Sequence, residues 1–244
     1  MLEAERFEKI LRELNKKEKL SYKELDSIIK VSSSTIRRDV EKMSRSGLLI
    51  KIKGGISQLK KLNFDPEITA RFNENVEEKK EIAEKAFKII ESGDFIYLDA
   101  GTTVFYLAEK LKNIDVTVIT NGITHIEELL KNRVKTILVG GEIKAATKSI
   151  VGIETIEFLS KYRFDKCFLG TNGISLEAGL TTPEINEAMV KREVLKVSGE
   201  KYVLADKEKF DKISNIKFSS LENCKIITTN EAIKENNRYK KYLY

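Results

Sequence analysis

Apolar residues at the start of the chain recur at helical spacing, and residues with capping side chains separate one group from the next. A single apolar stripe over residues 2–15 predicts an amphipathic helix, and its members are Phe7, Ile10, Leu11 and Leu14. The string Ser21-Tyr22-Lys23-Glu24 has the Ser-x-x-Glu form of a capping box. A second short helix is therefore expected to begin there.

A third helix is expected after Ser32, whose hydroxyl can cap the amides of the next turn, and Gly47 marks its end. Its apolar side consists of Ile36, Val40 and Met43, and its opposite side carries Ser34, Arg38, Glu41 and Arg45, with Ser33 and Arg37 beside them. Apolar residues then alternate with lysines over residues 49–53, and Gly54-Gly55 lead into a second apolar run over residues 56–59. This order predicts a helix-turn-helix followed by a hairpin wing.

From about residue 76 the pattern changes to short apolar runs separated by helical segments. A helix over residues 76–91 comes first, and strands are expected at residues 95–98, 116–119, 136–139, 167–169, 202–204 and 226–227. Strands that alternate with helices predict a doubly wound α/β fold with a mostly parallel sheet. The expected fold class is thus an α+β winged helix-turn-helix unit followed by an α/β unit.

A polar stretch separates the two patterns. Residues 63–75 include Asp65-Pro66 and Asn73 and show no extended apolar periodicity, which is typical of a linker. A length of 244 residues also favours two domains over one. We expect domains at residues 1–62 and 63–244, with residues 63–75 as the linker.

Composition excludes several classes of protein. Hydrophobic residues make up 41% of the chain and charged residues 34%, as in an ordinary globular protein. No apolar run reaches the length of a membrane-spanning helix, and the acidic Glu3, Glu5 and Glu8 stand where a signal peptide would be basic and then apolar. Two cysteines and one histidine are too few for a disulfide framework or a zinc site. We expect a cytoplasmic protein with no metal, no other cofactor and no membrane partner.

The net charge of +6 is concentrated in one segment. Residues 30–62 contain nine basic and two acidic side chains, a net charge of +7, whereas the 182 residues that follow carry a net charge of −1. A local excess of positive charge is typical of a polyanion binder, and charge alone leaves nucleic acid and acidic lipid both open. Its coincidence with the helix-turn-helix pattern favours double-stranded DNA. The candidate DNA contacts are Ser33, Ser34, Thr35, Arg37, Arg38, Lys42, Lys51 and Lys53.

Two strings in this segment resemble a known family. Residues 31–40 read Val-Ser-Ser-Ser-Thr-Ile-Arg-Arg-Asp-Val, and Gly47 and Lys51-Ile52-Lys53-Gly54-Gly55 follow. They are similar to the N-terminal signature of the DeoR/GlpR family of bacterial transcriptional repressors, whose wing usually reads Arg-x-His-Gly-Gly. The resemblance implies a repressor of a sugar-utilisation operon, and we expect it to bind operator DNA as a homo-oligomer, a dimer or higher.

Polar residues follow five of the expected strands. They are Asp99-Ala100-Gly101-Thr102-Thr103, Thr120-Asn121-Gly122, Gly140-Gly141, Gly170-Thr171-Asn172-Gly173 and Asp206-Lys207. Because ligands of open α/β sheets bind outside the carboxyl ends of strands, these loops predict a ligand site. A glycine and hydroxyl turn before a helix suits phosphate, and Asp99 can accept hydrogen bonds from sugar hydroxyls. Neither a Walker lysine nor Gly-x-Gly-x-x-Gly is present, which disfavours a nucleoside triphosphate or a dinucleotide as the ligand. A small phosphorylated metabolite fits better.

The family resemblance continues through these loops and through Gly179-Leu180-Thr181, Glu187-Ala188, Lys191-Arg192 and Asp206-Lys207-Glu208-Lys209-Phe210. It implies a fold related to ribose-5-phosphate isomerase and a phosphorylated sugar as effector. The same resemblance assigns the phosphate to Gly101, Thr102 and Thr103, the sugar to Asp99, Thr120 and Asn121, and neutralisation of negative charge to Lys191 and Lys209. From the polar loops, Gly140, Gly141 and Asp206 complete the candidate effector site.

Two other functions fit parts of the sequence. A sugar-phosphate isomerase with a basic appendage would need a carboxylate base, for which Asp99, Glu184 and Asp206 are candidates by residue type. An RNA-binding protein is weaker, because no stacking-aromatic motif accompanies the basic segment. We rank both below a DNA-binding regulator and expect no enzyme activity. His125 and Cys167 are expected to be structural.

Overall fold

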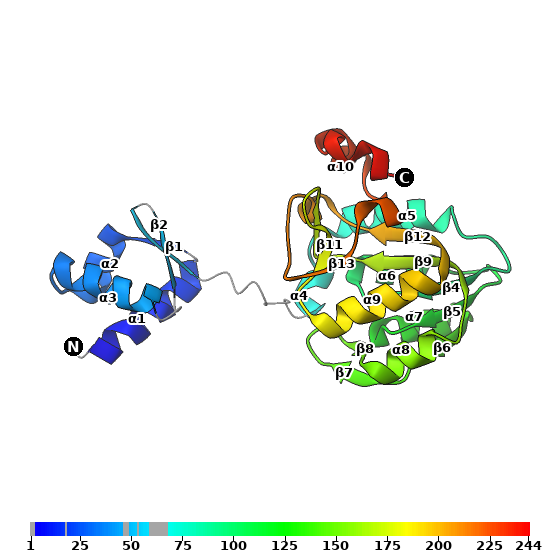
Figure 1. The fold of residues 1–244 in the computed structure, drawn as a ribbon, viewed down its shortest axis with the longest axis horizontal. Helices are drawn as coiled ribbons and strands as arrows, with labels where there is room; N and C mark the ends of the chain where they lie inside the picture. The colour runs from blue at the N-terminus through cyan, green and yellow to red at the C-terminus, as the bar shows by residue number, and fades with distance from the viewer. Residues whose placement is uncertain (1–2, 18, 46–48, 53, 59–67) are drawn as a thin grey trace. The chain divides into compact units, whose positions relative to one another are not determined.

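The computed structural model describes residues 3–17, 19–45, 49–52, 54–58 and 68–244 and divides the chain into two compact units, residues 1–62 and 63–244 (Figure 1). The first unit contains α1 (Glu3–Lys17), β1 (Lys19–Ser21), α2 (Tyr22–Ile29), α3 (Ser33–Arg45), β2 (Leu49–Ile52) and β3 (Gly55–Gln58). The three strands form an antiparallel sheet in the order β1-β3-β2. The predicted trio of helices and the hairpin are therefore confirmed.

The caps that the sequence indicated begin the two helices of the motif. The Ser21 hydroxyl accepts a hydrogen bond from the Glu24 amide, and the Glu24 carboxylate accepts one from the Ser21 amide. The Thr35 amide donates to the Ser32 hydroxyl at 3.3 Å, directly before α3. The apolar side of α3 packs into the core of the unit, where Ile36, Val40 and Met43 are fully buried.

Strand β1 was not predicted, because three residues show no period. It pairs with β3, so that Leu20 lies opposite Ile56 and both are buried. The strands approach closely at Gly55, where an added Cβ would lie 2.1 Å from the Leu20 carbonyl oxygen. The Tyr22 amide also donates to the Gly54 carbonyl at 3.0 Å, which ties the turn of the wing to the start of α2.

A buried ion pair joins α1 to α3. The Arg6 guanidinium donates from Nε to Asp39 Oδ2 at 2.6 Å and from Nη2 to Oδ1 at 3.1 Å, and the Asp39 side chain is 0% exposed. In the sequence Asp39 had counted only as an acidic charge inside a basic segment. The structure shows that it orients the helix that carries Arg37 and Arg38.

The second unit is built on six parallel strands in the order β14-β12-β9-β4-β5-β6. These strands are β4 (Phe95–Leu98), β5 (Thr117–Thr120), β6 (Lys135–Leu138), β9 (Phe164–Gly170), β12 (Ser198–Leu204) and β14 (Lys225–Ile227). Each overlaps a strand that the apolar runs predicted. The doubly wound, mostly parallel sheet is confirmed.

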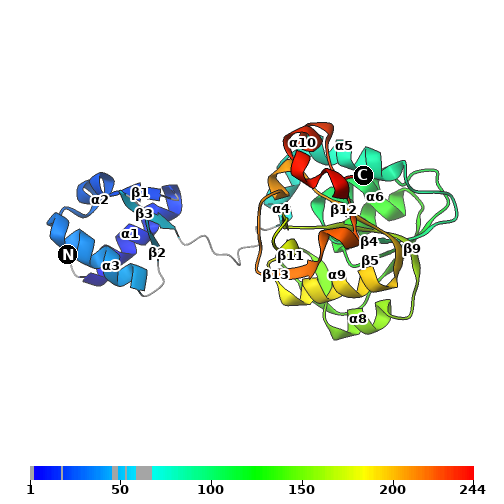
Figure 2. The same cartoon turned by 45° about the horizontal axis from the view of Figure 1, so that its top comes forward.

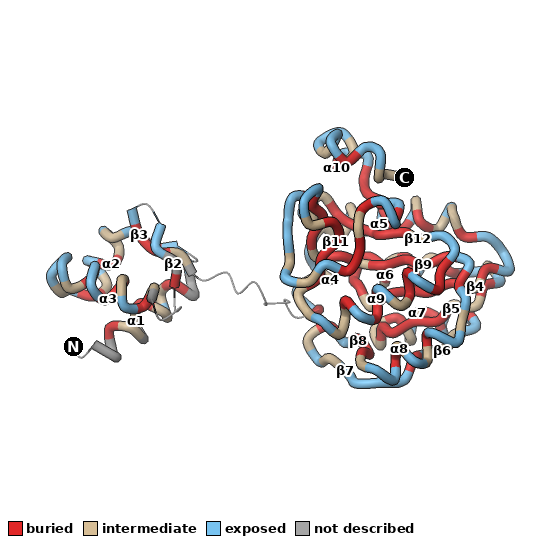
Figure 3. Tube along the Cα trace, in the orientation of Figure 1, coloured by how far each residue is buried: buried red, intermediate tan, exposed pale blue. Residues whose placement is uncertain are grey.

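Helices cover both faces of this sheet (Figure 2). One face packs against α5 (Val76–Phe87), α6 (Thr102–Lys110) and α7 (Ile126–Lys131), and the other against α8 (Ile153–Leu159) and α9 (Ile185–Val197). Alternate residues of β4 face the two sides of the sheet. Ile96 and Leu98 pack in the cluster that includes α5, α6 and α7, and Tyr97 packs in the cluster that includes α8 and α9. The central strands are accordingly buried along most of their length (Figure 3).

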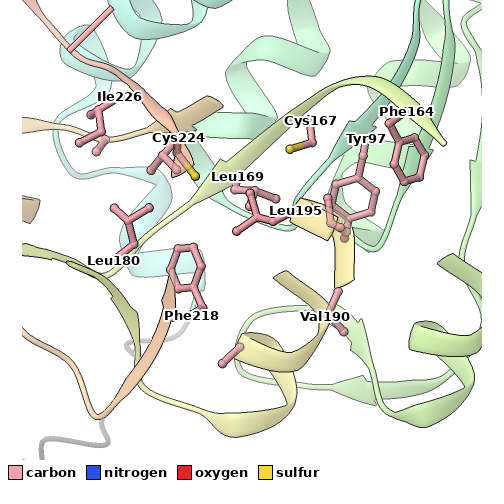
Figure 4. Packing of buried hydrophobic residues seen from close by; sticks show 14 of the residues in the cluster. Tyr97, Phe164, Cys167, Leu169, Leu180, Val190, Leu195, Phe218, Cys224 and Ile226 are labelled. Carbon is pink, nitrogen blue, oxygen red and sulfur yellow. The ribbon is translucent and has the colours of Figure 1, made fainter. Parts of the chain in front are cut away.

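Smaller elements extend the second face. A hairpin is formed by β7 (Glu142–Lys144) and β8 (Ser149–Val151), and an antiparallel sheet by β10 (Gly173–Ser175), β11 (Gly179–Thr182) and β13 (Ile216–Ser219). Figure 4 shows Leu180 of β11 and Phe218 of β13 in one cluster with Leu169 of β9. Cys167 is buried in this cluster, as the sequence predicted. The remaining helical segments are η1 (Ile123–His125), η2 (Lys207–Lys209), η3 (Leu221–Asn223), α10 (Asn230–Glu235) and η4 (Asn237–Tyr242).

Part of the expected linker is a helix of the second unit. Residues Ile68–Phe72 form α4, in which Ile68 is 2% exposed and its amide donates to the Ala146 carbonyl at 2.9 Å. The ring of Phe72 meets that of Phe105 on α6 edge to face, with 4.9 Å between the centroids. Five residues are too short for a helical period to be visible in sequence, and only their packing shows that they belong to this unit.

Asp39→Ala should destabilise the first unit by about 3–5 kcal/mol, because it removes the carboxylate that compensates the charge of the buried Arg6 guanidinium. Hydrogen exchange of the full-length protein, followed by mass spectrometry on peptides from residues 3–45, measures this. Asp26→Ala is the matched control, since Asp26 is an exposed acid of the same unit, and it should change the free energy of unfolding by less than about 1 kcal/mol. Equal protection in Asp39→Ala and the native protein would show that the pair does not stabilise the unit.

Candidate functional site

The exposed side of α3 carries the basic and hydroxyl residues that the sequence assigned to DNA. Ser33, Ser34, Arg37, Arg38 and Lys42 are all exposed. Neighbouring side chains contact some of the cations of this surface, including Arg37. The Arg37 guanidinium carbon lies 4.9 Å from the centre of the Tyr22 ring.

Lys51 of the wing also has a close contact, since its Nζ lies 2.6 Å from Glu41 Oε2 on α3. The hydrogen bond and the charge of Glu41 raise the pKa of Lys51. Thr35 differs from the expected contacts because it is half-buried and its hydroxyl lies 2.8 Å from that of Ser32, inside the helix cap. Lys53 lies outside the described residues.

A polar cleft lies at the carboxyl ends of β4, β5, β9 and β12, and we call it the sheet-edge cleft. It consists of two hollows whose walls share Arg71, Gly101, Gly170 and Thr171. The first hollow is also lined by Asp99, Ala100, Asn121, Thr147, Ser149, Asn172, Glu187 and Lys191. The second is also lined by Glu74, Lys79, Thr102, Thr103, Leu204, Asp206 and Lys209.

A buried ion pair closes the floor of the first hollow. Asp99 directly follows β4, and its Oδ2 accepts hydrogen bonds from the Gly170 amide at 2.8 Å and from the Lys191 ammonium group. Lys191 also donates to the Gly170 carbonyl at 3.1 Å. The side chains of Lys191 and Asp99 are only 9% and 7% exposed. The pair therefore links two neighbouring strands to α9.

The loop after β5 supports the same hollow. Asn121 Oδ1 accepts from the Ala100 amide at 3.0 Å, and its Nδ2 donates to the Ile150 carbonyl at 3.1 Å. Thr120, in contrast, is fully buried and outside both hollows, because its hydroxyl donates to the Leu98 carbonyl at 2.7 Å and accepts from the Gly122 amide. The Thr120 hydroxyl therefore joins β5 to β4 in this structure.

The second hollow surrounds the start of α6. Gly101 is the N-cap and supplies no side-chain cap, so the amides of the first turn, at Thr102 and Thr103, have no acceptor within the helix. Lys79 lines the same hollow, and its ammonium group donates to the Arg71 carbonyl. Burial lowers the pKa of Lys79 to about 8, against the opposing effect of the Asp206 charge. Basic side chains and unpaired helix amides thus line one small space.

Gly140 and Gly141 lie outside both hollows, and both are exposed. They follow β6, the outermost strand of the sheet, and lead into the β7–β8 hairpin. Thr155 of α8 donates to the Gly140 carbonyl at 2.8 Å, and a Cβ on Gly141 would lie 2.3 Å from the same hydroxyl oxygen. Their small size lets the hairpin pack against α8.

The carboxylates considered as bases are each engaged in a structural contact. Asp99 pairs with Lys191, Glu184 caps α9 by accepting from the amides of Asn186 and Glu187, and Asp206 caps η2. Glu184 lies outside both hollows. These contacts do not favour the isomerase hypothesis.

His125 is structural, as expected. Its ring is fully buried, and Nε2 donates to the Asp99 carbonyl at 2.8 Å while Nδ1 accepts from the Thr124 hydroxyl at 3.2 Å. Burial lowers the pKa of His125, which keeps the ring neutral. The ring therefore holds the loop that leads from β4 to α6.

Sequence reasoning missed four charged residues of the cleft, Arg71, Glu74, Lys79 and Glu187. Arg71 lay within the expected linker, and Lys79 lay in a charged helix with no distinguishing signal. Glu187 was quoted only as part of the family resemblance, yet it accepts hydrogen bonds from Lys144, Thr147 and Thr182 inside the first hollow. Burial acts to raise the pKa of Glu187, but the charges of Lys144 and Lys191 lower it below its ordinary value.

Two kinds of feature are absent from the described residues. Within them, no three histidine, cysteine, aspartate or glutamate side chains gather as metal ligands would. Among the helices of the same residues, none combines the length and the apolar character needed to cross a bilayer.

Lys191→Met should destabilise the second unit by about 3–5 kcal/mol, because Asp99 keeps its buried charge and loses the cation that compensates it. Lys209→Met is the matched control, since Lys209 is half-exposed and lies 3.7 Å from Asp206; its cost should stay below about 1 kcal/mol. Urea unfolding monitored by far-ultraviolet circular dichroism compares the two variants. Similar midpoints for both would show that the buried pair contributes no more than a surface contact.

Comparison with known proteins places the chain in a family. The DeoR-like helix-turn-helix domain matches residues 6–61, and the DeoR C terminal sensor domain matches residues 74–231. The chain is 39% identical over 230 residues to the HTH-type transcriptional regulator FruR of Bacillus subtilis, covering 94% of this chain and 92% of that protein. It is 34% identical over 249 residues to a lactose phosphotransferase system repressor of Staphylococcus epidermidis, covering 99% and 95%.

The solved structures add a likeness of fold alone. Ribose 5-phosphate isomerase A from Methanocaldococcus jannaschii aligns with a TM-score of 0.42 and 18% identity, over 56% of this chain and 55% of that one. The family named from the sequence motifs is confirmed by the two domain matches and the two relatives. The chain belongs to the DeoR family of helix-turn-helix transcriptional regulators, with a DNA-binding domain followed by a sensor domain.

Proposed function

We propose that this protein represses a sugar-utilisation operon and that a phosphorylated sugar in the sheet-edge cleft changes its affinity for operator DNA. The observation that carries the proposal is the second hollow, where the start of α6 meets Arg71, Lys79 and Lys209. Unpaired helix amides, a positive helix dipole and several cations in one place are the features that bind a phosphate group. The amides at Thr102 and Thr103 would hold its oxygens.

The adjoining first hollow suits the rest of such a ligand. Its walls carry amide, hydroxyl and carboxylate groups from Asn121, Ser149 and Glu187. The lowered pKa of Glu187 keeps this carboxylate ionised at neutral pH, so it can accept hydrogen bonds from sugar hydroxyls. A molecule with a phosphate at one end and hydroxyls at the other matches both hollows together.

For the first unit, we propose that α3 enters the major groove and that Arg37 and Arg38 reach base edges or phosphates, while Lys51 contacts the backbone beside them. The protein is proposed to act as a homo-oligomer in the cytoplasm. Two copies related by a two-fold axis would read two half-sites of one operator.

The direct test titrates the full-length protein into fluorescent DNA from upstream of its own gene, at fixed salt and with random DNA as the reference. The probes are ribose 5-phosphate, fructose 1-phosphate and fructose 6-phosphate, each beside its unphosphorylated sugar. Selective binding to one fragment, changed by a phosphorylated probe and not by the free sugar, is expected. Equal affinity for all fragments with no response to any probe contradicts the proposal.

Arg38→Ala should weaken operator binding by roughly 10-fold to 100-fold, the loss typical of one good base contact. Binding of sugar phosphates to the second unit should not change, since Arg38 belongs to the other unit. Lys112→Ala removes an exposed lysine of the second unit and serves as the charge-matched control. If the two variants bind operator alike, Arg38 is not part of the reading surface.

Affinity for a sugar phosphate should depend on the charge of Lys79, whose pKa is about 8. At pH 7 the ammonium form predominates and the phosphate is mostly a dianion, so affinity should be high there. As pH rises through 8, Lys79 loses its charge and affinity should fall roughly 10-fold by pH 9.5, while the phosphate stays a dianion.

Isothermal titration at pH 7, 8 and 9.5 measures this dependence. Lys79→Arg keeps the cation over the whole range, so the slope with pH should disappear in this variant. A slope that persists in Lys79→Arg would assign the pH dependence to another group.

A further inference from the structure

Several contacts that attach helix α4 to the second unit lie at or near the walls of the sheet-edge cleft. The Ile68 amide donates to the carbonyl of Ala146, next to Thr147 in the first hollow. The Phe72 ring packs on Phe105, which lies in the first turns of α6. The ammonium group of Lys79, in the second hollow, donates to the Arg71 carbonyl.

Arg71 itself lines both hollows and is half-buried. A guanidinium group is planar and offers paired donors, so it can bind two oxygens of one phosphate or bridge a phosphate and a neighbouring hydroxyl. Lys79 and Lys209 stand on α5 and η2, which are built into the body of the unit. Arg71 is the cleft cation that stands on α4, the first described element after residues 59–67.

A helix of five residues has little stability of its own, because a first helical turn is costly to form. The balance between its docked and undocked states therefore depends on its contacts with the rest of the unit. A ligand that contacts α4 only in the docked state shifts this balance, and such a differential contact is what coupling between two sites requires. The chain leads from α4 through residues 59–67 to the DNA-binding unit.

Building on the proposed function, we propose that Arg71 binds the anionic group of the effector and that this contact couples the cleft to the DNA-binding unit. The ligand holds α4 against the sheet edge through Arg71, and α4 restrains the chain that leads to α3. The other cations of the second hollow contribute to affinity for the ligand, and they do not couple the cleft to the DNA-binding unit.

The experiment compares Arg71→Gln with Lys209→Gln in the full-length protein. The probe is the phosphorylated sugar that changes operator binding of the native protein most strongly. Two quantities are measured, the Kd of the probe and the ratio of operator affinities without and with saturating probe. Both variants should weaken the probe roughly 10-fold, since each loses one charged contact to the phosphate.

The coupling ratio separates the two variants. At saturation Lys209→Gln should keep the native ratio, whereas Arg71→Gln should bring it close to 1. Arg71→Lys keeps the charge without the paired donors and should give an intermediate ratio. It also takes the place of Arg71→Gln if the latter cannot be saturated.

Hydrogen exchange provides a second readout that a loss of affinity alone would not change. Saturating probe should slow the hydrogen exchange of the amides of residues 68–73 in the native protein, and it should leave their exchange unchanged in Arg71→Gln. Amides of residues 99–105 should be protected in both, because the probe still occupies the start of α6.

Failure of this inference differs from failure of the proposed function. If no phosphorylated sugar changes operator binding of the native protein, the proposed function fails and the coupling role fails with it. If the native protein responds and Arg71→Gln responds to the same extent at saturation, Arg71 and α4 do not carry the coupling, and the proposed function stands.

Discussion

The carboxyl edge of the central sheet depends on one buried ion pair. Asp99 and Lys191 are both removed from water, and each would cost several kcal/mol to bury alone. Their contact, together with the hydrogen bonds to Gly170, fixes the ends of β4 and β9 against α9. Because these two charges satisfy one another, the floor of the cleft is neutral. The positive character of the site then comes from the second hollow, where cations gather around the unpaired amides of α6.

The same physical rule organises the DNA-binding unit. Asp39 is fully buried and is held by both nitrogens of the Arg6 guanidinium that face it, so α1 determines how α3 is oriented. On the exposed side of α3, the Tyr22 ring restrains Arg37, and Glu41 restrains Lys51. Long basic side chains lose conformational freedom when they bind, and side chains that are already held lose less. The reading surface is thus partly ordered before any DNA arrives.

The cleft has the arrangement of a binding site. Asp99, Glu187 and Asp206 each accept hydrogen bonds from neighbouring amides, lysines or hydroxyls, and these contacts hold the three carboxylates in place. What remains are amides and cations in one hollow and hydroxyl, amide and carboxylate groups in the other. Such a site recognises a charged, hydroxyl-rich molecule by complementarity. Arg71 of α4 lines both hollows, and α4 is the first described element of the second unit in chain order.

The sequence by itself determined the three helices of the first unit, the strands of the parallel sheet and the edge at which the polar loops gather. Apolar runs identify buried parallel strands, serine caps identify helix starts, and the carboxyl ends of parallel strands must meet at one edge. It could not separate Asn121, which lines the cleft, from Thr120, which bonds β5 to β4. Adjacent residues at a strand end face opposite ways, and which of them faces the cleft depends on the register of the strand in the sheet. Nor could it place Arg71 in the cleft or remove Gly140 from it. Those positions depend on which strand is outermost and which short helix docks, and both are decided by packing between residues far apart in the chain.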